Sequence, residues 1–143
     1  MVNKRLFGKI CYVQRQMSRE NAQLFAEYGI SPVQMHALVF IIKNADKGLA
    51  VCQKDVEREL NLRPSSVSSL LSNLERQGFL TRTLADGDAR TKRLELTDKG
   101  RDICFKDKLL MEKCDGAIAS ALTGQEQEQL DELLKKIIDA ISN

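Results

Sequence analysis

RPSSVSSLLSNLERQGFLTRTLADGDARTKRLELTDKG, from Arg63 to Gly100, decides the fold because its hydrophobic period changes halfway along. From Arg63 to Gln77 the apolar residues recur every three to four positions, which predicts a helix with one buried face. From Phe79 onward apolar and polar residues alternate as in a β-strand, and the alternation returns between Leu94 and Leu96. Asp86-Gly87-Asp88 lies between the two runs and is typical of a tight turn. The stretch therefore predicts a helix followed at once by a β-hairpin.

The residues just before this stretch predict a second short helix. Gln53 to Leu60 has an apolar inner face, and the turn at residues 61–64 separates it from the next helix. Pro64 suits the first turn of that next helix, and Gly78 suits its end. Two short helices joined by a tight turn form a helix-turn-helix, and the added hairpin gives the winged-helix order.

Helical periodicity also covers both ends of the chain. A long first helix is expected to end near Tyr28-Gly29, and Ser31-Pro32-Val33-Gln34 is a capping box that opens a second helix. Thr97 is expected to cap a fifth helix, and Thr123 and Glu126 form the capping box of the last one. The predicted fold class is therefore mainly α, a winged helix-turn-helix with a two-stranded β-wing and long N- and C-terminal dimerisation helices.

Composition indicates one ordinary globular domain. The chain has 143 residues, of which 43% are hydrophobic and 29% charged, with a net charge of +2. We expect a single domain over residues 1–143, made of a lobe at 31–100 and a helical dimerisation region at 1–30 and 101–143. The longest apolar run, Ala37 to Ile42, is far shorter than the roughly 20 residues of a membrane span.

The cysteine and histidine pattern predicts no metal site and no cofactor. The four cysteines show no CxxC spacing, and the single histidine cannot complete a ligand set of recognisable spacing. We therefore expect reduced thiols in a cytoplasmic protein. The sequence also lacks a Gly-rich phosphate loop, an HExxH motif and a nucleophile elbow, so no enzymatic machinery is visible.

The outward face of the helix at 63–77 is rich in short polar side chains. Serine is a weaker helix former than the Glu or Lys of an ordinary solvated face, but it lets a helix approach a surface closely. Small hydroxyl groups suit a helix that lies in the major groove of DNA. The alternative is an incidental polar surface. The predicted DNA-binding residues of this helix are Arg63, Pro64, Ser65, Ser66, Ser68, Ser69 and Asn73.

The hairpin is expected to reach the neighbouring minor groove. An arginine in a narrow minor groove senses its width and potential, and Arg90 near the tip is the predicted probe. Asp88 is expected to restrict that arginine by accepting its hydrogen bond or capping the turn. Arg82, Lys92 and Arg93 on the strands are expected to contact phosphates. The alternative is a flexible turn with Asp-Gly chosen for its backbone conformation.

Three motifs in this region carry a family resemblance: LxxxGF at Leu74 to Phe79, Asp88-Ala89-Arg90, and LTDKG at Leu96 to Gly100. Together they resemble the MarR family of bacterial winged-helix regulators. The resemblance implies a homodimer that binds double-stranded DNA at a pseudo-palindromic operator, usually as a repressor relieved by a small ligand or an oxidant. Two positions depart from the family pattern, since Cys52 stands where Thr or Ser is common and Ser69 where a charge is common.

The chain ends predict how two subunits would pair. A wide apolar stripe near the C-terminus consists of Leu133, Leu134, Ile137, Ile138 and Ile141. Residues 1–20 are mainly basic and residues 121–143 mainly acidic, so terminal helices of two subunits could attract each other. The alternative is that the stripe packs within its own subunit.

The resemblance also suggests where a signal would enter. The family places small ligands between the dimerisation helices and the DNA-binding lobe, which makes Met17, Met35, His36 and Phe40 candidate ligand-binding residues, with plain core packing as the alternative. Cys11 lies where a peroxide-sensing branch keeps its reactive cysteine, although the tyrosines of that branch are missing from the second helix. A further alternative is a winged-helix protein-assembly module that does not bind DNA.

Overall fold

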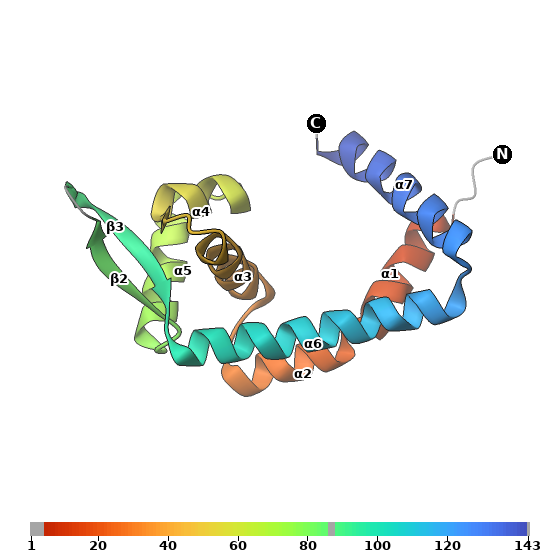
Figure 1. Ribbon diagram of the computed structural model, residues 1–143, viewed down its shortest axis with the longest axis horizontal. Coiled ribbons are helices and arrows are strands. Elements are labelled where there is room, and N and C mark those ends of the chain that lie inside the picture. Colours follow the sequence, from red (N-terminus) through yellow and green to blue (C-terminus); the bar gives the residue numbers. More distant parts are fainter. Residues whose placement is uncertain (1–4, 86–87, 143) are drawn as a thin grey trace. The chain divides into compact units, whose positions relative to one another are not determined.

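The computed structural model describes residues 5–85 and 88–142, and these ranges form helices and a small antiparallel sheet (Figure 1). The helices are α1 (Leu6–Met17), α2 (Arg19–Tyr28), α3 (Pro32–Asp46), α4 (Gln53–Leu60), α5 (Pro64–Arg76), α6 (Asp98–Ala121) and α7 (Gly124–Ile141). The strands are β1 (Val51–Cys52), β2 (Leu80–Ala85) and β3 (Asp88–Leu96). The mainly helical winged fold agrees with the fold class predicted from the sequence.

The chain divides into two compact units. Residues Met1–Asp107 form the first, and Lys108–Asn143 form the second, so the division falls within α6. The sequence predicted one domain over residues 1–143 with its inner boundary after residue 100. Ile103 and Cys104, beyond that predicted boundary, are buried in the core of the first unit, and the predicted division into lobe and dimerisation region stays a prediction.

The predicted long first helix is in fact two helices. Ser18 leaves the regular helical conformation, at φ −88° and ψ 4°, and separates α1 from α2. The break contains neither glycine nor proline, so no residue type indicated it. Gln14 donates a side-chain hydrogen bond to Ser18 Oγ at 3.3 Å, a local bond of the kind that competes with helical structure. The predicted end is confirmed, since α2 stops at Tyr28 and Gly29 adopts a left-handed conformation at φ 63°.

The predicted helix starts are confirmed by their capping bonds. Ser31 Oγ accepts from the Gln34 amide at 3.2 Å, and Gln34 Oε1 accepts from the Ser31 amide at 2.9 Å. Thr123 and Glu126 make the same reciprocal pair at the start of α7. At the start of α6, Thr97 Oγ1 accepts from the Gly100 amide at 3.1 Å.

The wing contains one strand more than the sequence predicted. The strand order is β1-β3-β2, all antiparallel, with Val51 opposite Leu94 and Leu80 opposite Leu96. β1 has only two residues, too few to show a period in the sequence. Asp88, expected in the turn, instead lies in β3 opposite Ala85. The rest of the predicted turn, residues 86–87, lies outside the described residues.

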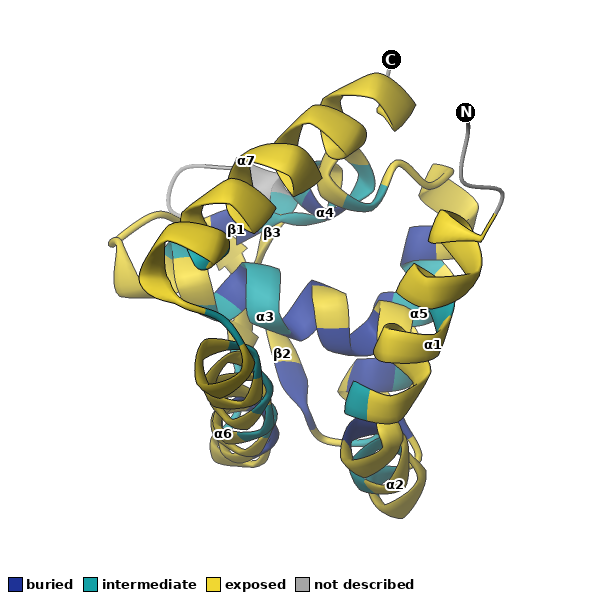
Figure 2. Ribbon diagram, turned by 90° about the vertical axis from the view of Figure 1, so that its right-hand side faces the viewer, coloured by how far each residue is buried: buried dark blue, intermediate teal, exposed yellow. Residues whose placement is uncertain are grey.

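The core of the first unit forms around α3 and the inner face of α5. Ala37 and Leu38 of α3 are completely buried, and so is Phe79, which follows α5. Figure 2 shows that α3 carries much of the buried colour, whereas α7 is drawn as exposed. Among the described residues no single helix is long and apolar enough to span a membrane, although α2 and α3, which meet at a bend of 88°, pass that test as a pair.

The start of α6 lies directly on the backbone that joins α5 to β2. A Cβ atom on Gly100 would stand 2.1 Å from the Phe79 carbonyl oxygen and 3.2 Å from Leu96 Cγ. The same carbonyl accepts from the Thr97 amide at 3.1 Å, and Thr97 Oγ1 donates to the Gly78 carbonyl at 2.6 Å. Only glycine fits at position 100, which accounts for the glycine that closes the LTDKG motif.

Gly100→Ala should therefore lower the free energy of unfolding by about 1 to 3 kcal/mol, because backbone must move to admit the methyl group. Gly116→Ala on the same helix is the matched control, since nothing lies within 4 Å of the added atom. The control should raise stability by about 0.5 to 1 kcal/mol through the better helix propensity of alanine. Urea unfolding followed by circular dichroism measures the free energy of unfolding of both variants. If Gly100→Ala were as stable as Gly116→Ala, the close approach at Gly100 would be contradicted.

Candidate nucleic-acid interface

Burial fixes which face of α5 is free. Val67, Leu71 and Leu74 are completely buried, so the opposite face of the helix turns away from the core. Arg63 is the extended N-cap residue and Pro64 occupies the first helical position, as predicted. Of the seven residues of this helix and its N-cap that were predicted to bind DNA, five are exposed and two are half-buried. The exposed ones are Arg63, Pro64, Ser65, Ser66 and Ser69, and the half-buried ones are Ser68 and Asn73.

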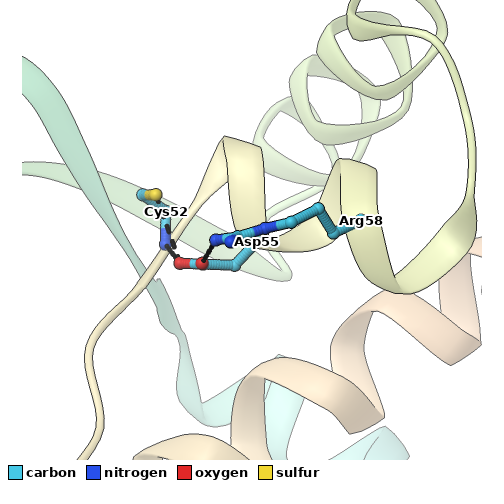
Figure 3. Close-up of polar contacts among 3 residues, drawn as sticks. All are labelled: Cys52, Asp55 and Arg58. Atoms are coloured by element: carbon cyan, nitrogen blue, oxygen red, sulfur yellow. Dashed lines mark hydrogen bonds and ion pairs between the residues drawn. The ribbon is translucent and has the colours of Figure 1, made fainter.

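The helix that precedes α5 is anchored by a carboxylate at its N-terminus (Figure 3). The Cys52 amide donates to Asp55 Oδ2 at 2.9 Å, and the Cys52 thiol donates to the same oxygen at 3.2 Å. Arg58 pairs with the other carboxylate oxygen, Oδ1. The hydrogen bond from the Cys52 amide is the main cause that lowers the pKa of Asp55, and the Cys52 thiol and Arg58 lower it further. Partial burial of the carboxylate acts in the opposite direction. Asp55 thus forms the N3 half of a capping box and holds the backbone of Cys52 at the start of α4.

The β2–β3 hairpin stands beside α5 and carries part of the predicted positive charge (Figure 1). Lys92 is exposed on β3, opposite Leu84 of β2. Arg93 is half-exposed and pairs with Glu95 at 3.4 Å, which offsets its charge. Of the basic strand residues of the wing, Lys92 and Arg93 therefore lie on the surface as predicted.

A hollow of about 320 Å³ lies between the start of α4 and the wing. Lys54, Arg82 and Lys92 contribute to its wall, together with Gln53 and Thr91. Sequence reasoning did not single out Lys54. The one sequence feature that could have indicated Lys54 is its place in the first turn of α4, the first helix of the helix-turn-helix. The sequence alone could not place the wing strands beside that turn.

Arg82 does not extend from the wing surface as the sequence suggested. Its side chain is only 18% exposed and lies against α5, where Nη2 donates to Ser72 Oγ at 3.2 Å. Asp88 and Arg90 belong to β3 by their backbone, but their side chains, like Asp86 as a whole, lie outside the described part of the structure.

The four candidate ligand-binding residues do not share one environment. Met35 is 3% exposed and belongs to the core, and Phe40 packs against that core. His36 is exposed and its Nε2 lies 3.2 Å from Glu59 of α4, whereas Met17 is half-buried at the end of α1. A hollow of about 300 Å³ lies at the end of α3, and its described lining includes none of the four. The wall of this hollow consists of Ile41, Ile42, Ala45, Leu49, Ala50, Val51, Arg93, Leu94, Glu95, Leu96 and Arg101.

All four cysteines are free thiols, and Cys11, the redox candidate, is half-buried. Burial, assisted by the negative charge of Asp107, raises the pKa of Cys104 to about 12, so that thiol stays protonated at neutral pH. No group of three or more metal-binding side chains occurs among the residues that the structure describes.

Comparison with known proteins agrees with this arrangement. The sequence model of the MarR family matches residues 28–91. The transcriptional repressor MprA of Escherichia coli K12 is 20% identical over 137 residues, which are 95% of this chain and 77% of that protein. The transcriptional repressor MdtR of Bacillus subtilis is 26% identical over 127 residues, 88% of this chain and 79% of that protein. Both relatives are regulators rather than enzymes.

A solved structure reproduces the whole fold. The crystal structure of Staphylococcus aureus MepR in complex with DNA is 25% identical to this chain. The two align over 95% of this chain and 97% of that one, with a TM-score of 0.71. The winged helix-turn-helix predicted from the sequence is thereby confirmed.

Asp55→Ala should destabilise the protein by about 1 kcal/mol near neutral pH, because the first turn of α4 loses its cap. Since the folded state lowers the pKa of Asp55 from 3.8, this stabilisation is complete above that value and is lost as pH falls through the folded pKa. The difference in unfolding free energy between the two proteins should therefore stay nearly constant down to about pH 4 and shrink between about pH 4 and about pH 2. A difference that stays constant over this range would contradict the assigned cap.

Proposed function

We propose that this chain, whose residues 28–91 match the MarR family, is a winged helix-turn-helix DNA-binding repressor that acts as a homodimer on a pseudo-palindromic operator. The observation that carries this proposal is the serine-rich outer face of α5 beside a basic wing, in the fold that MepR uses in its complex with DNA. Such a regulator works where the bacterial chromosome lies, in the cytoplasm.

The two parts of the interface contribute in different ways. Ser65, Ser66 and Ser69 are exposed on the outer face of α5, and their small size permits close approach to base edges in the major groove. Arg63, Lys54 and Lys92 are exposed cations around this face, suited to contact phosphates. Arg90 of the wing supplies the minor-groove contact. The helix thus reads sequence while the cations fix its position.

Salt dependence separates this function from a protein-assembly module of the same fold. Each phosphate that the dimer neutralises releases counterions, so affinity for a random duplex should fall steeply between about 50 and 200 mM salt. Fluorescence anisotropy with a labelled duplex measures this directly. A flat response, or no binding at the lowest salt, would favour the assembly module.

Two substitutions test the groove assignment. Ser66→Glu places a carboxylate against DNA and should abolish operator binding, whereas Arg90→Ala should weaken it by about 1 to 3 kcal/mol. Ser142→Glu, at the end of α7, is the control for an added charge and should bind like the parent. Anisotropy titrations report affinity, and circular dichroism checks that the fold is intact. Parental affinity for either interface variant would show that the assignment is wrong.

The case for a homodimer rests on apolar surface at both ends of the chain. Neither α1 nor α7 contains a buried residue (Figure 2). Leu134 is 41% exposed, Ile138 55% and Ile141 76%, and a contiguous row of exposed apolar side chains is typical of a protein–protein contact. α1 is also basic and α7 acidic, so that helices from two subunits can bury these faces and attract each other.

A charge within this stripe should separate the subunits. We expect Leu134→Glu to shift the protein from dimer to monomer in sedimentation equilibrium, and to weaken operator binding because one half-site gives little affinity. Gln129→Glu adds the same charge to the same helix outside the stripe and should remain a dimer. If Leu134→Glu also remained a dimer at micromolar concentration, the interface would lie elsewhere.

We also propose that a small ligand relieves repression. Met17, Met35, His36 and Phe40 remain predicted contacts of that ligand, although the core position of Met35 favours a packing role. The alternative of a redox-sensing regulator rests on Cys11 alone. Cys104, the most buried of the thiols, is poorly suited to that role because burial raises its pKa.

A further inference from the structure

We propose that Arg82 is a positioning residue that ties the wing to α5, and that it does not contact DNA itself. This inference rests on the proposed DNA-binding function, because its consequence is the placement of the wing tip in the minor groove. It replaces the phosphate contact that the sequence suggested for Arg82.

Among the residues that the structure describes, the hydrogen bonds and the ion pair of the Arg82 guanidinium group all go to one helix, α5. Nη2 donates to Ser72 Oγ at 3.2 Å and lies 3.5 Å from the Ser68 carbonyl oxygen. Nε lies 3.7 Å from Glu75 Oε2. Ser68, Ser72 and Glu75 succeed one another along one face of α5, so a single side chain from β2 spans about two turns of that helix.

Burial makes this group a poor phosphate ligand. The Arg82 side chain is 18% exposed, against 49% for Arg93 on the same sheet. The Nε atom is buried and has no hydrogen-bond partner among the described residues, and its charge is balanced at 3.7 Å by Glu75. To reach a phosphate the guanidinium would have to leave Glu75 and both serines.

Arg82 lies at the point where the hairpin leaves the core, so its contacts with α5 can fix the direction of the wing. Arg82 lies in β2 opposite Leu94, whose side chain is buried in the core, and β2 continues from there toward the tip. Beyond this point the wing strands carry exposed side chains such as Leu84 and Lys92. Arg82 is therefore positioned to fix the direction in which the free part of the hairpin leaves the lobe.

The planar guanidinium is essential to this role. It can donate toward Ser72 and Ser68 while keeping Nε near Glu75, whereas the ammonium of lysine is a single point charge. A phosphate contact, in contrast, depends mainly on charge, so lysine would largely replace arginine. The two roles thus predict opposite behaviour for the charge-conserving variant.

The test compares Arg82→Lys and Arg82→Gln with the parent in operator binding, alone and combined with Arg90→Ala. Both Arg82 variants should weaken binding by about tenfold, within the range for a lost groove contact. In the Arg90→Ala background the same changes should cost less than about twofold, because the wing contact they control is already gone. Lys92→Gln is the matched control and should weaken binding equally in both backgrounds.

Three results would overturn the inference. The first is parental binding by Arg82→Lys together with weakened binding by Arg82→Gln, which indicates a charge contact with phosphate. The second is a loss from Arg82→Gln that persists in full in the Arg90→Ala background. The third is loss of the fold by both Arg82 variants in thermal unfolding, which indicates a general structural role. If the parent protein binds no duplex at all, the proposed function itself fails, and that outcome is distinct from these three.

Discussion

The complete burial of one face of α5 is the constraint on which the rest of the structure depends. Val67, Leu71 and Leu74 are 0% exposed and sit one turn apart, so the rotation of the helix about its own axis is fixed. The opposite face of α5 must then point away from the core, and this face carries Ser65, Ser66 and Ser69. Loss of that buried face would remove both the stability of the lobe and the orientation of its polar surface.

Two sets of contacts position the wing, one at the junction between α5 and β2 and one along α5 itself. At its base, Gly100 lies against the Phe79 carbonyl and brings α6 onto the junction between α5 and β2. Further out, Arg82 reaches from β2 back to Ser72 and Glu75 of α5. These contacts join the wing to α5, and in the proposed function that connection sets where the wing lies relative to the helix.

Local rules predicted most of this fold, and the failures have a common cause. Helix starts at Pro32 and Gly124 followed from capping residues, which act over three or four positions. None of the three failures is visible in the apolar period. The strand β1 and the contacts of Arg82 depend on residues far away in the sequence, and the break at Ser18 accompanies a side-chain hydrogen bond from Gln14. The exposed serines were predictable because periodicity fixed the buried face opposite them, whereas Lys54 gained its place only from the wing beside it.

The central claim is that two copies of this chain present α5 and the wing to successive turns of one duplex. Selection of bound sequences from a random duplex library tests it most directly. The account predicts a shared pseudo-palindrome with half-sites about one helical turn apart, roughly 10 base pairs. Recovery of sequences without a common motif, or of a single asymmetric element, would contradict it.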